Sequence, residues 1–378
     1  MKFLFLLTYY YPHWTGLTQY AQRLAEGLAK KNQVTVLTAK HNPNLKTEES
    51  INSVNVKRKS VLFRLSRTLI SFELILSFFK EILKSEAVVI YLPYADVLLT
   101  SIITKIFGKK LYLVHNGDLT LPSGFFNRFL EAVYNLTSKY AIVLSNKTIV
   151  QTDDYLKSSR LLFPLRPKIS VVLPLFADYQ NKKNPVKNIK DNAEIQLSQF
   201  SGYKKVGFAG RFVEEKGFDI LLSSIPLVLR DYPKTQFVYA GEVKMIYEQF
   251  FEKNQDLVEQ SQNNLIFLGR LDKDGMAAFY KNIDLLVISS RSDCFPSVGV
   301  EAMLSGVPVV VTDIPGARWP VKVTGMGIIV EKENPKKLAS GIIKGLKIRN
   351  KLIQNKAKAE KIFNYNTTLS KYEKIFKE

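Results

Sequence analysis

The amino-acid sequence predicts an α/β protein made of two doubly wound domains. Short apolar runs typical of buried strands alternate with helix-like stretches, which is the pattern of βαβ units and parallel sheets. The alternation breaks in a polar stretch rich in lysine and asparagine, residues 178–201, and then begins again. The chain has 378 residues, more than one hydrophobic core usually serves. We therefore expect two Rossmann-like domains that face a central cleft.

The first half of the chain contains strand and helix signals in strict alternation. The expected strands are Phe3–Leu7, Val34–Thr38, Ala87–Tyr91 and Leu111–Val114, with strand-like runs at Ala141–Leu144 and Lys147–Gln151. The expected helices are Leu17–Ala29, Leu69–Leu83, Val97–Phe107 and Arg128–Lys139. These elements predict a first domain over residues 1–173.

The second half repeats the alternation after the polar stretch. The expected strands are Lys205–Ala209, Gln236–Ala240, Leu265–Leu268, Leu285–Ser289, Val307–Thr312 and Gly327–Val330. The expected helices are Phe218–Asp231, Met245–Glu252, Gly275–Lys281, Ser297–Ser305 and Pro335–Leu346. These elements predict a second domain over residues 174–362, followed by a closing helix within 363–378.

The composition indicates a soluble protein with anionic partners. The net charge is +20, and the excess of basic residues is present on both sides of residue 180. Nucleotides, nucleic acid or an anionic membrane would suit such a surface, although a lysine-rich composition that only aids solubility explains the charge equally well. Cys294 is the single cysteine, which fits a reducing compartment and a buried packing role. Residues 61–83 form the longest apolar stretch, but its five charged side chains argue against a membrane-spanning helix.

Two carboxylates, Asp293 and Glu301, flank the turn from a buried strand into a short helix. The carboxyl ends of parallel strands, beside helix amino termini, are where open α/β sheets bind ligands. Ser297 is the expected N-cap residue, which places Glu301 in the first helical turn, where it could accept hydrogen bonds from ribose hydroxyls. The alternative is purely structural: one acid caps the helix and the other interacts with its dipole.

The segment Gly210–Gly217 follows the first strand of the second half and combines glycine with cations. Gly210 lets the backbone turn and approach a ligand, while Arg211 and Lys216 could neutralise a diphosphate. Solvent-exposed basic residues in a loop are the alternative explanation.

The first half offers Gly16 and His115 at its own strand ends. His115 could donate a hydrogen bond to a sugar, or it could be an imidazole satisfied within the core. The absence of a GxGxxG motif disfavours a dinucleotide redox cofactor. The Asp272-Lys273-Asp274 sequence formally matches a metal motif, but a turn or helix cap is the expected role, and no metal site is predicted.

Taken together, these segments resemble the family 4 retaining glycosyltransferases, which have the GT-B fold. The most specific matches are Gly210-Arg211 with Lys216-Gly217, the spacing from Asp293 to Glu301, and the following Glu-Ala-Met-x-x-Gly-x-Pro-Val-Val run. The resemblance covers nearly the whole chain and implies a metal-independent hexosyl transfer from a nucleotide-diphosphate sugar with retained anomeric configuration. It also implies that the C-terminal helix crosses back to the first domain.

The resemblance assigns a role to each candidate site residue. Arg211 and Lys216 would bind the donor diphosphate beside Gly210, and Glu301 would hold the ribose. The transferred sugar would contact His115, Asp293 and the backbone of Phe295, Pro296, Ser297 and Val298. The base would border Gly269, Arg270 and Leu271, and Gly16 would let the first domain approach the phosphates. Asp293 stands where the family usually has Glu, Pro296 where it usually has Gly, and Thr15 where a second Gly is common.

The first domain is expected to bind the acceptor, a glycan or a lipid-linked sugar of surface polysaccharide, lipopolysaccharide or glycolipid synthesis. The basic residues Lys57, Arg58, Lys59, Arg64 and Arg67 precede the apolar run Leu69–Phe79, a combination that suits peripheral contact with an anionic membrane from the cytoplasm. A core helix beside a solvated basic loop is the alternative. Two other functions compete: a GT-B nucleotide-sugar epimerase, and a non-catalytic polyanion-binding protein. No nucleic-acid-binding motif is present.

Overall fold

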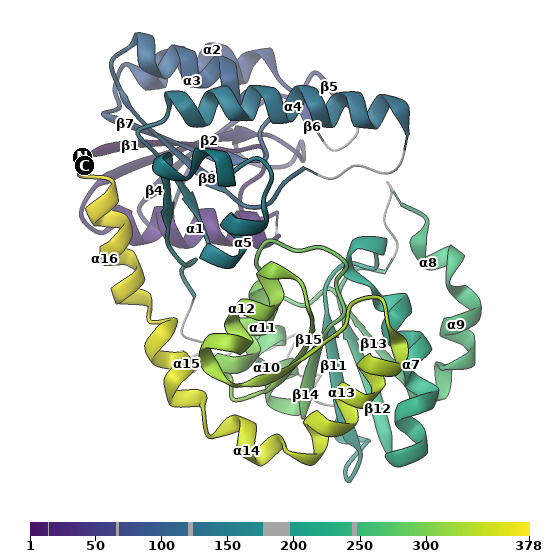
Figure 1. Ribbon diagram of the computed structural model, residues 1–378. Coiled ribbons are helices and arrows are strands. Elements are labelled where there is room, and N and C mark those ends of the chain that lie inside the picture. Colours follow the sequence, from purple (N-terminus) through teal and green to yellow (C-terminus); the bar gives the residue numbers. More distant parts are fainter. Residues whose placement is uncertain (14, 66–67, 120–123, 177–196, 244–247) are drawn as a thin grey trace. The chain divides into compact units, whose positions relative to one another are not determined.

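The computed structural model describes residues 1–13, 15–65, 68–119, 124–176, 197–243 and 248–378 (Figure 1). The chain divides into two units. Unit 1 is Met1–Ala177 together with Asn364–Glu378, and unit 2 is Asp178–Phe363. Most of the polar stretch that we expected to connect two domains, residues 178–196, lies outside the described residues.

Unit 1 contains an eight-stranded sheet in the order β10-β9-β8-β7-β1-β2-β4-β3. Its strands are β1 Lys2–Leu6, β2 Gln33–Ala39, β3 Glu48–Ile51, β4 Val54–Lys59, β7 Ala87–Leu92, β8 Lys110–His115, β9 Lys147–Val150 and β10 Ile169–Val171. All neighbours are parallel except β3 and β4, which pair antiparallel. The strand order changes direction at β1, so the loop after β1 lies at the switch point where such sheets bind ligands.

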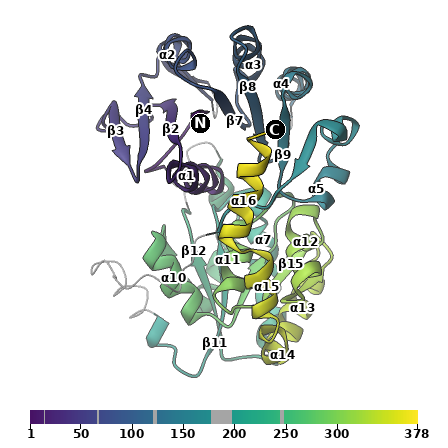
Figure 2. The same cartoon turned by 90° about the vertical axis from the view of Figure 1, so that its left-hand side faces the viewer.

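Helices cover both faces of this sheet (Figures 1 and 2). They are α1 Gly16–Ala29, α2 Phe72–Ile82, α3 Val97–Ile106, α4 Phe125–Leu144, α5 Asp153–Ser158 and the C-terminal α16 Tyr365–Ile375. One face packs on α1 and α16 through alternate strand residues such as Phe3 and Tyr112, whose rings both contact that of Phe376. The helices α2, α3 and α4 lie side by side on the other face (Figure 2).

Two expectations for unit 1 were wrong. Ala141–Leu144, expected to be strand-like, is the last turn of α4, because an apolar run of four residues fits a buried helix face as well as a strand. The helix expected from Leu69 begins only at Phe72, because Thr68–Ile70 is the strand β6, which pairs with β5 (Phe63–Leu65). The hydroxyl of Ser71 then accepts a hydrogen bond from the Leu74 N–H and caps the helix.

The alternative of a solvated basic loop at Lys57-Arg58-Lys59 is contradicted as well, because these residues belong to β4 and each is paired with an acid. The Lys57 ammonium lies 3.0 Å from the Glu81 carboxylate, and Lys59 lies 3.3 Å from Glu73. Arg58 is 1% exposed, pairs with Glu49 and donates a hydrogen bond to the Tyr11 carbonyl. The sequence missed the β3–β4 hairpin because charged side chains occupy positions that strands usually fill with apolar ones.

Unit 2 contains a six-stranded, wholly parallel sheet in the order β13-β12-β11-β14-β15-β16. Its strands are β11 Lys204–Ala209, β12 Thr235–Ala240, β13 Leu265–Gly269, β14 Leu285–Ile288, β15 Val309–Thr312 and β16 Gly327–Val330. Its helices are α7 Phe218–Asp231, α8 Phe250–Lys253, α9 Gln255–Gln260, α10 Lys273–Asn282, α11 Ser297–Leu304, α12 Pro315–Thr324, α13 Pro335–Lys347, α14 Arg349–Ile353 and α15 Lys356–Ile362. The predicted α/β class with two parallel-sheet domains is confirmed.

Most unit 2 boundaries agree with the expected ones to within two residues. The helix expected over Met245–Glu252 falls partly on residues 244–247, outside the described part, and the observed helix α8 begins at Phe250. The Asp272 side chain accepts a hydrogen bond from the Gly275 N–H at 2.8 Å, which confirms its expected role as a helix cap.

Gly241, directly after β12, lies where two backbone segments of unit 2 approach each other closely. Its φ is 155°, and a Cβ there would lie 1.8 Å from the Gly210 carbonyl oxygen. We expect Gly241→Ala to lower the free energy of unfolding by about 3 kcal/mol, because strain and a backbone clash add. Gly202→Ala is the matched control: φ is also positive there, but no atom lies within 4 Å, so about 1 kcal/mol is expected. Equal losses in urea titrations would contradict the close approach.

Candidate functional site

The carboxyl edge of the unit 2 sheet gathers most of the residues that the sequence singled out. Gly210 and Arg211 follow β11, and Asp293 lies in the loop between β14 and α11. Gly269 ends β13, two strands away from β11. Because these strands are parallel, the loops after them emerge at the same edge, the usual ligand-binding edge of an α/β sheet.

A close contact joins the loop after β11 to the loop after β14. Lys216 donates a 2.6 Å hydrogen bond to the Asp293 carboxylate, with the two side chains 20% and 14% exposed. Gly217 makes this approach possible, since a Cβ there would lie 2.2 Å from the Ser289 carbonyl oxygen. The Ser289 hydroxyl donates in turn to the Gly217 carbonyl at 2.6 Å. The two loops therefore form one surface with a cation and a carboxylate in contact.

Electrostatics keep the Lys216 ammonium charged. Burial alone would lower the pKa of Lys216, but the carboxylates of Asp293 and Glu215 outweigh it and raise that pKa above its ordinary value. The positive charge of Arg211 opposes this rise, so Arg211 and Lys216 lie near enough to interact. Two cations at one strand end are an arrangement suited to a polyanion such as a diphosphate.

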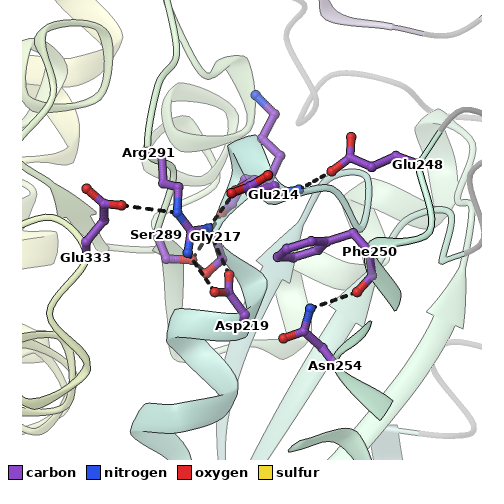
Figure 3. A network of polar contacts seen from close by, with 10 residues as sticks. Glu214, Gly217, Asp219, Glu248, Phe250, Asn254, Ser289, Arg291 and Glu333 are labelled. Atoms are coloured by element: carbon purple, nitrogen blue, oxygen red, sulfur yellow. Dashed lines mark hydrogen bonds and ion pairs between the residues drawn. The ribbon is translucent and has the colours of Figure 1, made fainter. Parts of the chain in front are cut away.

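An arginine that the sequence did not single out holds the same two loops together (Figure 3). The Arg291 guanidinium binds both oxygens of Asp219 at 2.9 and 2.6 Å and donates to the Glu214 carbonyl at 2.7 Å. These hydrogen bonds raise the pKa of Arg291 further. Figure 3 also shows Glu333 beside this guanidinium, at 3.4 Å from its Nε. Asp219 lies on α7 and Arg291 after β14, so only the tertiary structure shows that they form a bidentate pair.

The structure corrects two details of the α11 turn. Pro296, not Ser297, is the N-cap residue, and no side chain caps this helix. Glu301 is consequently in the second turn of α11 rather than the first. It is 3% exposed, and the Tyr280 hydroxyl donates a 3.2 Å hydrogen bond to it. A buried carboxylate held by a tyrosine is preorganised to accept hydrogen bonds, which weakens the explanation that Glu301 is only a helix-dipole acid.

The backbone N–H groups of the α11 turn are only partly available to a ligand. The Phe295 N–H donates to the Asp293 carboxylate at 3.3 Å, and the Gly299 N–H donates to the Pro296 carbonyl. Asp293 therefore organises the turn and holds Lys216 at the same time. Gly316, at the start of α12, packs against this turn so closely that a Cβ would lie 2.2 Å from the Cys294 carbonyl oxygen.

In unit 1, His115 lies at the end of the strand β8, and Gly16 lies between β1 and α1, at the helix start, both as expected. Gly16 is the first residue of α1, and Thr15 and Thr18 form a capping box at that helix start. His115 ends β8 and is fully buried, with its Nε2 3.0 Å from the Asp118 carboxylate. Its buried Nδ1 has no hydrogen-bond partner among the described residues. The imidazole is thus oriented on one side and unsatisfied on the other.

Asp118 is fixed by several donors. Burial would raise the pKa of Asp118, but hydrogen bonds from His115, Ser159 and Tyr155 outweigh burial and lower it. Asp118 therefore stays ionised at neutral pH and acts as the orienting partner of His115.

Within the described part of the chain, no group of three or more His, Cys, Asp or Glu side chains could hold a metal ion. Cys294 is buried, as expected of a packing residue.

Comparison with known proteins shows which proteins this chain is similar to. Residues 189–362 match the family model described as glycosyl transferases group 1. The match covers 174 of the 378 residues, and we call this part of the chain the group 1 domain. This domain is the part that contains the Lys216–Asp293 contact, Arg291 and Glu301.

The whole chain has the GT-B fold of solved glycosyltransferase structures. Sucrose-phosphate synthase from Thermosynechococcus elongatus superposes with a TM-score of 0.78 and 18% identity, over 100% of this chain and 98% of that one. Anabaena HepE in complex with UDP-glucose gives a TM-score of 0.76 and 17% identity, over 100% and 99%. In sequence, the phosphatidyl-myo-inositol mannosyltransferase of Mycobacterium leprae is 27% identical over 187 residues, 47% of this chain and 48% of that protein. The chain spans about half the length of the curated relatives it matches.

The bidentate pair of the group 1 domain can be tested by a double-mutant cycle. We expect Arg291→Ala and Asp219→Ala to show a coupling energy of about 1–2 kcal/mol in urea unfolding, because two charge-assisted hydrogen bonds are lost together. The more exposed pair Arg318 and Asp313, with a single 3.0 Å contact, is the matched control and should couple by about 0.5 kcal/mol. A coupling no larger than in this control would show that Arg291 does not hold the loops together.

Proposed function

We propose that this protein is a retaining glycosyltransferase that moves a sugar from a nucleotide-diphosphate sugar to an acceptor hydroxyl without a metal ion. The observation that carries the proposal is the contact of Lys216 with Asp293 between two strand-end loops of the group 1 domain. It places a charged ammonium, kept protonated by its neighbours, beside a carboxylate at the ligand-binding edge of a parallel sheet. A sugar diphosphate has the complementary chemistry: an anionic diphosphate and hydroxyl donors.

The proposed donor site uses each group according to its charge. Arg211 and Lys216 bind the diphosphate beside Gly210, and the buried Glu301 accepts hydrogen bonds from the ribose. Asp293, with the backbone of residues 295–298, binds hydroxyls of the transferred sugar. Gly269, Arg270 and Leu271 border the base. Anabaena HepE, which shares the fold, is known in complex with UDP-glucose, which supports a nucleotide-sugar donor.

In the proposed reaction, the bond from the anomeric carbon to the diphosphate oxygen breaks while the acceptor oxygen attacks that carbon on the same face. The departing diphosphate gains negative charge, which Arg211 and Lys216 stabilise more strongly in the transition state than in the bound donor. The acceptor proton passes to the departing phosphate oxygen, so the step requires no protein nucleophile.

For the acceptor, we propose a glycan or lipid-linked sugar of surface polysaccharide, lipopolysaccharide or glycolipid synthesis, bound by unit 1. The similarity to a phosphatidyl-myo-inositol mannosyltransferase supports a glycolipid. A single buried cysteine fits work in a reducing compartment such as the cytoplasm.

Two substitutions test the donor site. We expect Lys216→Ala and Glu301→Gln each to lower the rate of sugar transfer by about 10²–10³-fold, since each removes one charge from the donor complex. A thermal-shift panel of UDP, GDP, ADP and their sugars identifies the donor first, because a ligand at 100 times its Kd adds about 2.7 kcal/mol to the stability of the wild type.

The exposed Lys253, also in the group 1 domain, is the control site, and Lys253→Ala should transfer sugar at the wild-type rate. Circular dichroism establishes that each variant is folded. Near-wild-type transfer by Lys216→Ala or Glu301→Gln would remove the site assignment.

Turnover of the nucleotide sugar without any acceptor would favour an epimerase, and salt-dependent binding of polyanions with no nucleotide-sugar affinity would favour a binding protein.

Metal removal tests the proposed charge compensation separately. Because Arg211 and Lys216 supply the positive charge that a divalent ion would otherwise provide, excess EDTA should leave the transfer rate within about twofold of the untreated enzyme. Loss of activity in EDTA that added Mg²⁺ or Mn²⁺ restores would contradict the metal-independent mechanism.

A further inference from the structure

Large hydrophobic side chains are exposed on unit 1 and nowhere on the described part of unit 2. Of the nineteen such residues, fifteen lie on α2, α3 and α4 or at their C-terminal caps. They are Phe72, Leu76, Phe79, Leu83, Leu99, Ile102, Ile106, Phe107, Phe125, Phe126, Phe129, Val133, Leu136, Tyr140 and Val143, and we call them the apolar face. Isolated exposed hydrophobic residues are common, but a large contiguous set marks an interaction surface.

The apolar face follows the helical repeat, so it is not a random scatter of side chains. On α4, Phe126, Phe129, Val133, Leu136, Tyr140 and Val143 succeed one another at intervals of three or four residues. The opposite side of α4 packs inward through buried residues that include Tyr134, Ala141 and Ile142. On α2, Phe72, Leu76, Phe79 and Leu83 form a similar outward stripe. On α2 and α4, one side of the helix thus packs on the core, and the other carries an apolar stripe that no described residue covers.

The three helices bring these stripes together. The Phe79 ring lies 6.4 Å from the Phe107 ring, which joins α2 to the end of α3. The helices α3 and α4 pack directly against each other. Figures 1 and 2 both show α2, α3 and α4 as one layer on the sheet of unit 1. The apolar face is therefore a broad surface and not three separate ridges.

Basic residues accompany the apolar face. The exposed charged side chains on and directly after these helices are Lys80, Lys84, Lys105, Arg128 and Lys139, together with the acid Glu73. Glu73 is paired with Lys59, and a second acid, Glu81, is largely buried against Lys57. The remaining acids are Asp96, the N-cap residue of α3, and Glu131, both half-buried, and the exposed Glu86 between α2 and β7. The charge presented with the apolar face is consequently positive, in a chain whose net charge is +20.

We propose that the apolar face docks onto a lipid bilayer with anionic headgroups, with α2, α3 and α4 lying in the plane of the interface. Phenylalanine and leucine stripes beside lysines are the composition of helices that insert shallowly and bind anionic lipid electrostatically. Among the described residues, no helix has the length and apolar character needed to cross a bilayer. A second copy fits less well, because a twofold interface would bring the same basic residues together. The proposal does not rest on the proposed transferase activity.

Flotation of the full chain with vesicles tests the proposal. The wild type should float with phosphatidylcholine vesicles that contain one-third phosphatidylglycerol, and high salt should weaken this binding. We expect Phe129→Ser combined with Leu136→Ser to lower the bound fraction at least tenfold, and since both side chains are more than half exposed, the fold should tolerate the change. Phe163→Ser with Val171→Ser, two exposed residues of unit 1 outside the apolar face, is the matched control and should float like the wild type.

Two further measurements separate insertion from other causes. Lys80→Gln, Lys84→Gln and Lys139→Gln together should reduce flotation on anionic vesicles, whereas the exposed set Lys332→Gln, Lys336→Gln and Lys337→Gln in unit 2 should not. A tryptophan introduced as Phe129→Trp should be quenched by brominated lipid, compared with the native tryptophans of the wild type. Absence of flotation, equal flotation of both serine variants, or a wild-type dimer in sedimentation that Phe129→Ser/Leu136→Ser converts to a monomer would each overturn the proposal.

Discussion

The contact between the Gly217 turn and the end of β14 is the constraint on which the unit 2 site depends. A side chain at position 217 could not fit beside the Ser289 carbonyl oxygen, so the two backbones can approach only through glycine. Once they meet, Lys216 reaches Asp293, and Arg291 reaches both Asp219 and the Glu214 carbonyl. The close approach of these two backbone segments thus positions both ion pairs, Lys216 with Asp293 and Arg291 with Asp219.

This constraint also determines the charge balance of the site. Lys216 is charged because Asp293 and Glu215 stabilise its ammonium, and Asp293 in turn holds the Phe295 N–H of the neighbouring turn. A ligand that brings its own negative charge can take over part of the role of Asp293 and release that carboxylate to accept hydrogen bonds from hydroxyls. The short side chain of Asp293 therefore affects the position of Lys216 as well as any contact to a sugar. In the proposed donor complex, recognition of the diphosphate and recognition of the sugar would be coupled through this pair.

The sequence predicted the strand ends well, because apolar runs indicate the buried strands of the parallel sheet and glycines indicate the turns after them. It placed Arg211, Lys216 and Asp293 at one sheet edge for that reason. It could not single out Arg291, because Arg291 holds the two loops together by binding Asp219, which lies 72 positions earlier in the chain. It placed Glu301 one residue too close to the helix start because Ser297 is a good N-cap residue, while Pro296 in fact occupies that position without a capping side chain. It missed the β3–β4 hairpin because a buried Arg58 looks like a solvated one until its partners Glu49 and Tyr11 are known.

The apolar face shows a further limit of sequence patterns. A helix with apolar residues all round is normally buried on all sides, and for the stretch that contains α2 the sequence left a core helix open as the alternative to membrane contact. Figure 2 shows α2, α3 and α4 as a layer of helices on this side of the unit 1 sheet, and no other described residue covers their outward apolar side chains. Exposed aromatic and branched side chains promote aggregation, and a stable protein retains so many of them only where something covers them. The covering surface must be apolar, and it must not place further positive charge beside the lysines of the apolar face. An anionic bilayer meets both requirements. A second copy of the chain meets only the first, because a twofold interface would bring the lysines of both copies together.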